Sequence, residues 1–409
     1  MEKVNGRYNV GGVLLERPFK IRRLGHFGFN CSDLEEGVEF YTKLLGFRLT
    51  DQLDLSKLPV PELQNALAKV KDPRLIFTTY GTDHHALALA HRSVGAVFGD
   101  DKDSPDITVN QITWQLGTLE EVVNACHFFK ANGVPIRRMG RDMPGSNWHV
   151  YVGDPDGHTI ELYYGIEQVG WDGKSKPLPM YYRRFDTVPE LPQMSESMEV
   201  EEAMQKGIDI FSGHRNREPL PSAYNVGGVL LPRPFKITRI GPVGFFVKDV
   251  ARSEEFYVET LGFVKTEEVS FKGRRCLFLR NGTEHHSLGL FPKELRQELG
   301  LSAHTSCMTF GAEVGSYGQL RNAITFLKER GAKFVNSIPP DLYPGIDYAA
   351  HALDPDGHCI QLYYYMEQVG WDGKPRPRAE RRAVSDEWPE TLPPLSDTYA
   401  DQTFQGPLG

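Results

Sequence analysis

Cysteine is scarce in this chain of 409 residues, and the five that occur form no recognisable pattern. They are odd in number, scattered along the chain and never spaced as CxxC. A disulfide framework or a structural zinc knuckle is therefore not expected, because both need closely patterned cysteines. A reducing cytoplasm is the compartment that fits such a chain.

Long apolar runs and clusters of basic residues are also lacking. No stretch approaches the ~20 apolar residues that a membrane helix requires, and the N-terminal sequence MEKVNGRYNV has no apolar core typical of a secretion signal. The formal net charge is −8, and we find no basic patch that would suit nucleic acid or an anionic membrane. We therefore expect a cytoplasmic protein that binds neither nucleic acid nor membrane.

What the sequence does contain is a long internal repeat. YNVGGVLLERPFKIRRLG at 8–25 returns as YNVGGVLLPRPFKITRIG at 224–241, and DPDGHTIELYY at 154–164 returns as DPDGHCIQLYY at 354–364. We therefore predict two tandem domains. The expected order is a first domain at 1–177, a linker at 178–223, a second domain at 224–377 and a C-terminal tail at 378–409.

Each copy divides again into two similar halves. In the first copy, alternating and helical periodicity predicts a strand at 22–34 and a helix at 35–46, followed by strands near 47–53, 74–80 and 84–91. The same order follows as a strand at 109–119, a helix at 120–133 and strands near 134–140, 147–153 and 158–164. The predicted fold class is α+β, with four βαβββ modules paired into two tandem barrel-like domains.

Strand alternation gathers polar side chains on one face of the first copy. The residues concerned are His26, Gln111, Thr113, His149, Tyr151 and Glu161. Such a face is costly to bury unless its groups bind water, a metal ion or a polar ligand.

The second copy does not keep the same side chains. We align His26, Gln111 and Glu161 of the first copy with Pro242, Cys307 and Gln361 of the second. One-sided loss of residues that can bind a metal suggests a working half and a supporting half.

These residues give the chain a resemblance to the vicinal oxygen chelate superfamily, and within it to the two-domain type I extradiol ring-cleaving dioxygenases. That family builds each domain from two βαβββ modules and holds Fe(II) with two histidines and a glutamate. The resemblance implies that His26 is the first metal ligand and Glu161 the third. Gln111 stands where the second histidine is expected.

The resemblance also implies acid–base residues. DHHALALA at 83–90 is similar to the strand that carries the family's catalytic histidine, which points to His85. Tyr151, three residues before the DP turn, matches the substrate-binding tyrosine. The family has a further histidine near the position of Asp142, where this sequence has none, and His149 is the substitute that we consider.

Two departures from the family pattern bear on the chemistry. The family usually places its iron in the C-terminal domain, whereas here only His286 and His351 remain in the second copy. Gln111 is a weaker ligand for iron than histidine, and hard oxygen donors shift preference toward Mn or Mg. Glutamine does serve as a ligand in related glyoxalase and epimerase members.

Three functions therefore stay open. The favoured one is an extradiol-type dioxygenase that uses Fe(II) and O2 on a catechol-like aromatic substrate. The second is a redox-neutral isomerase, epimerase or lyase that works with Mn(II), Zn(II), Co(II) or Ni(II) on a substrate with vicinal oxygens. The third is a small-molecule binding protein without turnover. The long segments after each copy favour contacts between chains, and hence a homo-oligomer.

Overall fold

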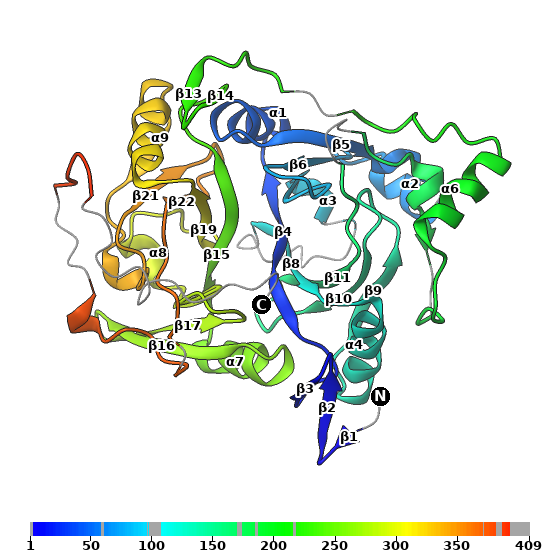
Figure 1. Ribbon diagram of the computed structural model, residues 1–409, viewed down its shortest axis with the longest axis horizontal. Coiled ribbons are helices and arrows are strands. Elements are labelled where there is room, and N and C mark those ends of the chain that lie inside the picture. The colour runs from blue at the N-terminus through cyan, green and yellow to red at the C-terminus, as the bar shows by residue number, and fades with distance from the viewer. Residues whose placement is uncertain are drawn as a thin grey trace. The chain divides into compact units, whose positions relative to one another are not determined.

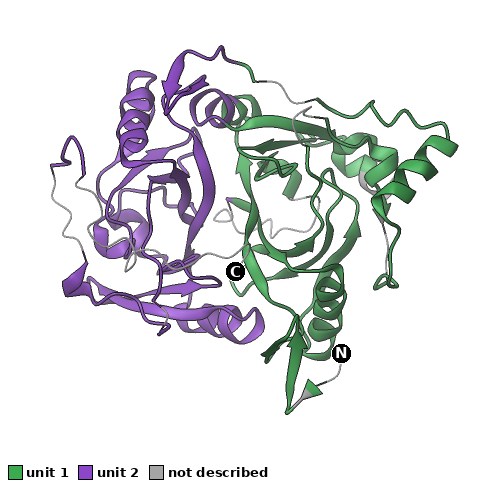
Figure 2. Cartoon of the chain, viewed as in Figure 1, with its two compact units in different colours: residues 1–38, 47–104, 109–219 green, residues 39–46, 105–108, 220–409 purple. Residues whose placement is uncertain are grey.

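The computed structural model describes residues 3–58, 61–95, 97, 108–169, 174–184, 187–215, 218–370, 372–381 and 387–392. Their contacts form two compact units (Figures 1 and 2). The first comprises residues 1–38, 47–104 and 109–219, and the second comprises 39–46, 105–108 and 220–409. The boundaries expected at 177, 223 and 377 stay predictions, and most of the expected tail lies outside the described residues.

The first unit is a curled nine-stranded sheet in the order β12-β9-β10-β11-β8-β4-β7-β6-β5. One module supplies β4 (Ile21–Cys31), β5 (Arg48–Asp54), β6 (Arg74–Thr79) and β7 (Leu87–His91). The other supplies β8 (Val109–Leu116), β9 (Ile136–Arg141), β10 (Trp148–Gly153) and β11 (Thr159–Tyr164). The central strands β4 and β8 run antiparallel, and each has a parallel outer neighbour, β7 and β11.

The second unit repeats this plan with eight strands in the order β16-β17-β18-β15-β19-β22-β21-β20. Its strands are β15 (Ile237–Val247), β16 (Val264–Phe271), β17 (Arg274–Arg280), β18 (Leu288–Pro292), β19 (Cys307–Val314), β20 (Lys333–Val335), β21 (Ala349–Leu353) and β22 (Cys359–Tyr363). The α+β class, the four modules and the barrel-like curl of both sheets are confirmed.

The modules carry their helices in the predicted places. These are α1 (Leu34–Glu39) with η1 (Phe40–Leu44), α4 (Leu119–Ala131), α7 (Val250–Glu255) with η3 (Phe256–Thr260), and α9 (Tyr317–Glu329). The remaining helices are η2 (Leu55–Lys57), α2 (Pro61–Leu67), α3 (Arg92–Gly95), α5 (Leu178–Tyr181), α6 (Glu196–Gln205), α8 (Leu295–Glu298), η4 (Pro340–Leu342) and η5 (Arg378–Glu380). Short strands are β1 (Lys3–Val4), β2 (Arg7–Val10), β3 (Val13–Leu15), β12 (Arg183–Arg184), β13 (Tyr224–Val226) and β14 (Val229–Leu231).

Helix α4 shows how the sequence selects the outer face of the sheet. Thr118 caps its start by accepting a hydrogen bond from the backbone N–H of Glu121, and it ends before Gly133, whose positive φ of 68° favours glycine. The helix packs on β8 to β11 (Figure 1). Alternate residues of β8, such as Trp114, are fully buried beneath it. The opposite side of the same strand therefore faces the inside of the curl.

The segment expected to be a linker packs against the first unit up to residue 219. Its strand β12 pairs with β9, and its helix α6 carries Glu199. Glu199 accepts a hydrogen bond of 2.8 Å from Nη2 of Arg141, and both side chains are buried. Most of this segment thus belongs to the first unit, and β12 extends the edge of its sheet.

All five cysteines are buried free thiols, as a chain without disulfides was expected to have. Separately, none of the helices in the described ranges is both long and apolar enough to cross a membrane.

Replacing Glu199 by Met is expected to lower the free energy of unfolding by about 3–5 kcal/mol, because it leaves the Arg141 guanidinium buried without its carboxylate. Urea denaturation followed by circular dichroism measures this change. The matched control is Glu202→Met on the same helix, where the partner Arg183 and Glu202 itself are each about one third exposed. An equal loss in both variants would contradict the buried ion pair.

Candidate active site

Three adjacent strands bring the polar residues of the first unit together. Sheet register sets His26 of β4 opposite Thr113 of β8, and Thr113 beside Glu161 of β11. Because paired residues of neighbouring strands project to the same side, these three side chains meet inside the curl. Nε2 of His26 lies 3.0 Å from Oε2 of Glu161.

Glu161 is the most completely buried charge of this group, with 0% of its surface exposed. Its Oε2 also accepts a hydrogen bond from the hydroxyl of Thr113 at 2.9 Å, and its Oε1 accepts one from the amide of Asn147 at 2.7 Å. Burial by itself would raise the pKa of Glu161, but the charge and hydrogen bond of His26, then His149 and Thr113, lower that pKa to about 2. The residue is therefore a carboxylate at neutral pH.

A cavity of about 480 Å³ in the first unit opens onto this carboxylate. Its polar lining includes His26, His85, Gln111, Tyr151 and Glu161. The structure thus brings together five of the six residues that the sequence proposed as metal ligands or catalytic groups, all except His149. The size is that of a pocket for a small organic molecule.

Gln111 lies two residues from Thr113 on β8, opposite Gly28 of β4. Its side chain is half-buried, lines the cavity and has no hydrogen-bonding partner within the described part of the chain. Its amide oxygen is therefore available to a ligand that enters the cavity.

The donor set formed by His26, Gln111 and Glu161 fits a divalent ion in composition. Two ligands at right angles and about 2.1 Å from an ion are about 3.0 Å apart, which is close to the separation of His26 Nε2 and Glu161 Oε2. Among the described residues, no group of three or more His, Cys, Asp and Glu side chains is arranged to hold a metal. A metal here would need the Gln111 amide as its third protein ligand.

His85 and Tyr151 supply opposite proton-transfer properties. The ring centroid of His85 lies 4.2 Å from that of His26, and burial, then the charges of His26 and His84, lowers the pKa of His85 well below its usual value. It is thus a neutral base near pH 7. Burial, then the charge of Glu161, raises the pKa of Tyr151 well above its usual value, so its phenol stays a hydrogen-bond donor.

His149 does not line the cavity. It is fully buried, with Nδ1 3.6 Å from Oε1 of Glu161 and Nε2 3.1 Å from Oδ1 of Asp142. The residue lies behind the carboxylate, between two acidic groups, and beside the ring of Tyr151 at a centroid distance of 4.7 Å. This position suits support of the site rather than contact with a bound molecule.

Sequence reasoning missed Asn147 and Arg138. Asn147 precedes His149 and Tyr151 at the same alternation, so extending the face of β10 by one step would have found it. The guanidinium carbon of Arg138 lies 4.6 Å from the ring centroid of Tyr151, and Arg138 lines the cavity with about 30% of its side chain exposed. Nothing in the local pattern of β9 marks it.

The second unit corrects one residue pairing made from the sequence. Gly28 pairs with Gln111, and the equivalent Gly244 pairs with Thr309, so Thr309 rather than Cys307 occupies the position of Gln111. Cys307 pairs with Phe245 at the site of Val109. The copies differ in length after this strand, and sequence matching alone placed the difference wrongly.

Apolar side chains fill the interior of the second unit at the corresponding place. Asn30 pairs with Ala90 in the first unit, whereas Phe246 pairs with Phe291 in the second. Both phenylalanines belong to a buried cluster that also contains Phe278 and Met308. The first unit keeps an open polar interior where the second is packed.

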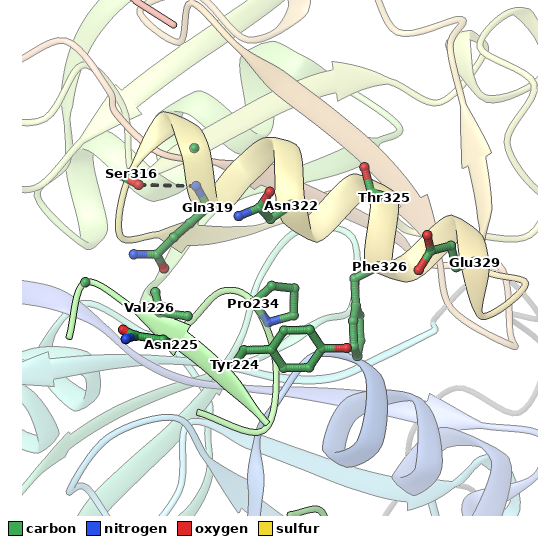
Figure 3. Close-up of a pocket in the computed structure, with 12 residues that line it drawn as sticks. Tyr224, Asn225, Val226, Pro234, Ser316, Gln319, Asn322, Thr325, Phe326 and Glu329 are labelled. Carbon is green, nitrogen blue, oxygen red and sulfur yellow. Dashed lines mark hydrogen bonds between the residues drawn. The ribbon is translucent and has the colours of Figure 1, made fainter. Parts of the chain in front are cut away.

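Another cavity, of about 570 Å³, lies in the second unit between α9 and the β13–β14 hairpin (Figure 3). Gln319 and Phe326 of α9 face Tyr224 and Pro234 across it. Its lining contains one carboxylate, Glu329, and no histidine. It has no acid–base or metal-binding set comparable to that of the first unit.

Comparison with known proteins gives a family match over both copies of the repeat and weaker similarity to two kinds of enzyme. The family model described as the Glyoxalase/Bleomycin resistance protein/Dioxygenase superfamily matches residues 23–162 and 239–362. Metapyrocatechase 2 of Cupriavidus necator is 28% identical over 149 residues, which cover 36% of this chain and only 38% of that protein. Lactoylglutathione lyase of Escherichia coli O157:H7 is 28% identical over 143 residues, or 34% of this chain and 90% of that protein.

The fold is similar to that of a solved structure, the 2,3-dioxygenase LapB of Pseudomonas sp. KL28. The TM-score is 0.54 at 14% sequence identity, and the alignment covers 87% of this chain and 96% of that one. At this identity the likeness concerns the fold.

The stability of the metal-free protein should depend on pH through His85. The folded-state pKa of His85 is lower than the value near 6.5 that an unfolded chain has, so its contribution to stability is complete above that pH and is lost as the pH falls. We expect the free energy of unfolding to fall between about pH 7 and about pH 5, and His85→Gln to weaken this fall. Urea titrations measure it.

The control is His127→Gln, on the exposed side of α4. A fall in His85→Gln as steep as that of the unaltered protein would contradict the buried neutral imidazole.

Proposed function

The chain belongs to the glyoxalase, bleomycin resistance protein and dioxygenase superfamily, as its repeated motifs predicted, and we propose that its first unit is a metal-dependent extradiol-type dioxygenase. The proposed substrate is a catechol-like aromatic. One observation carries the proposal: Glu161 is a buried carboxylate 3.0 Å from His26 in a cavity that also presents His85 and Tyr151. The second unit lacks the counterparts of His26, Gln111 and Glu161.

His26, Gln111 and Glu161 are the residues proposed to hold the ion, with Fe(II) favoured. When bound, such an ion supplies Lewis acidity toward vicinal oxygens and, as Fe(II), one-electron chemistry with O2. Thr113 and Asn147 fix the orientation of Glu161 through the hydrogen bonds that its oxygens accept. His149 supports the same carboxylate from behind.

The remaining residues are proposed to bind the substrate and move its proton. The two arginines of the lining, Arg137 and Arg138, make the cavity attractive to an anionic catecholate. His85 takes the proton of the substrate hydroxyl at Nε2, because its Nδ1 already faces Nδ1 of His84 at 3.0 Å. The hydroxyl of Tyr151 donates a hydrogen bond to a substrate oxygen.

A redox-neutral reaction is the second candidate, and Gln111 is the residue that favours it. An amide oxygen suits Mn(II), and Zn(II), Co(II) or Ni(II) could take the same three ligands. The similarity to lactoylglutathione lyase, which covers 90% of that enzyme, also favours a redox-neutral reaction. In this case the substrate would carry two vicinal oxygen atoms, and the rate of its turnover would not depend on dissolved O2.

We also propose a cellular compartment and an oligomeric state for the protein. Five buried free thiols suit a reducing compartment such as the cytoplasm. Self-association into a homo-oligomer remains an expectation from the long segments that follow each copy, and light scattering of the purified chain tests it.

Replacing Glu161 by Gln is expected to remove most of the bound metal, because the only anionic ligand is lost. Elemental analysis of protein purified without oxygen measures the metal content. The matched control is Gln361→Ala at the equivalent position of β22, which should keep the full content. Unchanged metal in Glu161→Gln would overturn the assigned site.

Replacing His85 by Ala is expected to lower kcat for catechol cleavage by about 10²–10⁴-fold while the metal content stays unchanged. Oxygen uptake with Fe(II)-reconstituted protein and the yellow colour of a ring-fission product report the reaction. Turnover with Mn(II) or Zn(II) at a rate that does not depend on O2 would support the redox-neutral candidate instead. Ligand binding that needs no metal and gives no product would indicate a binding protein.

A further inference from the structure

We propose that Asp51, acting through His84, fixes the tautomer of His85 in which Nε2 is unprotonated and able to accept a substrate proton. Asp51 is then a positioning residue for the proposed base His85. The effect of Asp51 on the reaction rate rests on the proposed function. The hydrogen-bonded arrangement itself is independent of that function.

Three side chains form a continuous buried row. Oδ2 of Asp51 lies 3.4 Å from Nε2 of His84, and Nδ1 of His84 lies 3.0 Å from Nδ1 of His85. His84 and His85 are 0% and 2% exposed. His85 lines the cavity, whereas Asp51 lies at the far end of the row on β5.

The order of the groups selects the proton positions. An ionised carboxylate only accepts hydrogen bonds, and a neutral imidazole carries one N–H and one acceptor nitrogen. Asp51 therefore draws the proton of His84 to Nε2, which leaves Nδ1 of His84 as an acceptor. His85 then donates its own N–H from Nδ1, and its lone pair remains on Nε2.

Neighbouring groups fix Asp51 and cover the junction between the two histidines. The hydroxyl of Ser175 donates to Oδ2 of Asp51 at 3.0 Å, and the backbone N–H of Gln52 donates to Oδ1 at 2.7 Å. At the junction of the histidines, a Cβ placed on Gly145 would lie 3.0 Å from His85 and 3.2 Å from Nδ1 of His84. Backbone thus covers the junction and limits access of water as a competing partner.

The second unit contains the same row without the proposed metal ligands. Asp51 pairs with Phe77 in the sheet, and the equivalent Glu267 pairs with Phe278. Oε2 of Glu267 lies 2.9 Å from Nε2 of His285, and the Nδ1 atoms of His285 and His286 are 3.1 Å apart. There, Nη2 of Arg381 also lies 2.8 Å from Oε2 of Glu267 and 3.3 Å from Nε2 of His285. The chain therefore provides an internal comparison in which a similar row lies in the unit without the proposed metal ligands.

The kinetic experiment compares Asp51→Asn with Glu267→Gln, using catechol, O2 and Fe(II)-reconstituted protein. An amide in place of Asp51 can donate to Nε2 of His84, which reverses both tautomers and puts a proton on Nε2 of His85. We expect kcat to fall by about 10²-fold or more in Asp51→Asn, with KM and metal content unchanged. Glu267→Gln should keep kcat within about threefold, a small part of what a general base contributes.

Asp51→Glu is the conservative variant, since a glutamate occupies the equivalent position beside His285 in the second unit. It should restore most of the kcat lost in Asp51→Asn. An equal loss of kcat in Asp51→Asn and Glu267→Gln, or a normal kcat in Asp51→Asn, would overturn the proposal. The thermal unfolding temperature of each variant, compared with that of the unaltered protein, shows whether a loss of kcat comes from misfolding.

Nitrogen-15 NMR of the histidine rings in the metal-free full chain reads the tautomer directly and needs no activity. His85 is assigned by the signal that disappears in His85→Gln. An unprotonated Nε2 supports the proposal, whereas a protonated neutral Nε2 overturns it even if the variants fail to fold. If the tautomer is as expected but no variant or parent consumes oxygen with catechol, the proposed function fails and the positioning role stands.

Discussion

The buried carboxylate of Glu161 is the constraint on which the site depends. An ionised group removed from water costs several kcal/mol unless other groups replace its hydration. Here His26, Thr113 and Asn147 surround both oxygens, and they come from β4, β8 and the residue before β10. The charge is stable inside the first unit only when these strands keep their register, so the fold and the site require each other.

The two units show what the same backbone does with and without that charge. Where the first has Glu161 and Thr113 side by side, the second has Gln361 beside Gly311. Phe291 then occupies the place of Ala90, and full burial of such a ring stabilises a core by about 1.5–3 kcal/mol. The first unit has a cavity at the place where the second has packed side chains.

Both units nevertheless keep a carboxylate and two adjacent histidines along one row. In the packed unit, the contacts of Glu267 with His285 and of His285 with His286 offset part of the cost of burying these polar groups. In the first unit the same row ends at the cavity. Under the proposed function, this shared arrangement acts on a substrate only in the first unit, where the cavity and Glu161 lie beside it.

Local periodicity was sufficient to predict the modules and a helix at 120–133, which the structure has at 119–131. It also predicted the side of each strand on which His26, Gln111 and Glu161 lie, because alternation and helix caps act over a few residues. It could not predict that Thr309 corresponds to Gln111, since strand bulges and length differences between the copies shift the register. Nor could it join Asp51 to His84, or Arg138 to Tyr151. Arg138 of β9 is the register partner of Tyr151 on β10, and Asp51 of β5 meets His84 in the segment between β6 and β7. Both contacts follow from which strands pair and in which register, and neither the pairing nor the register can be read from local periodicity.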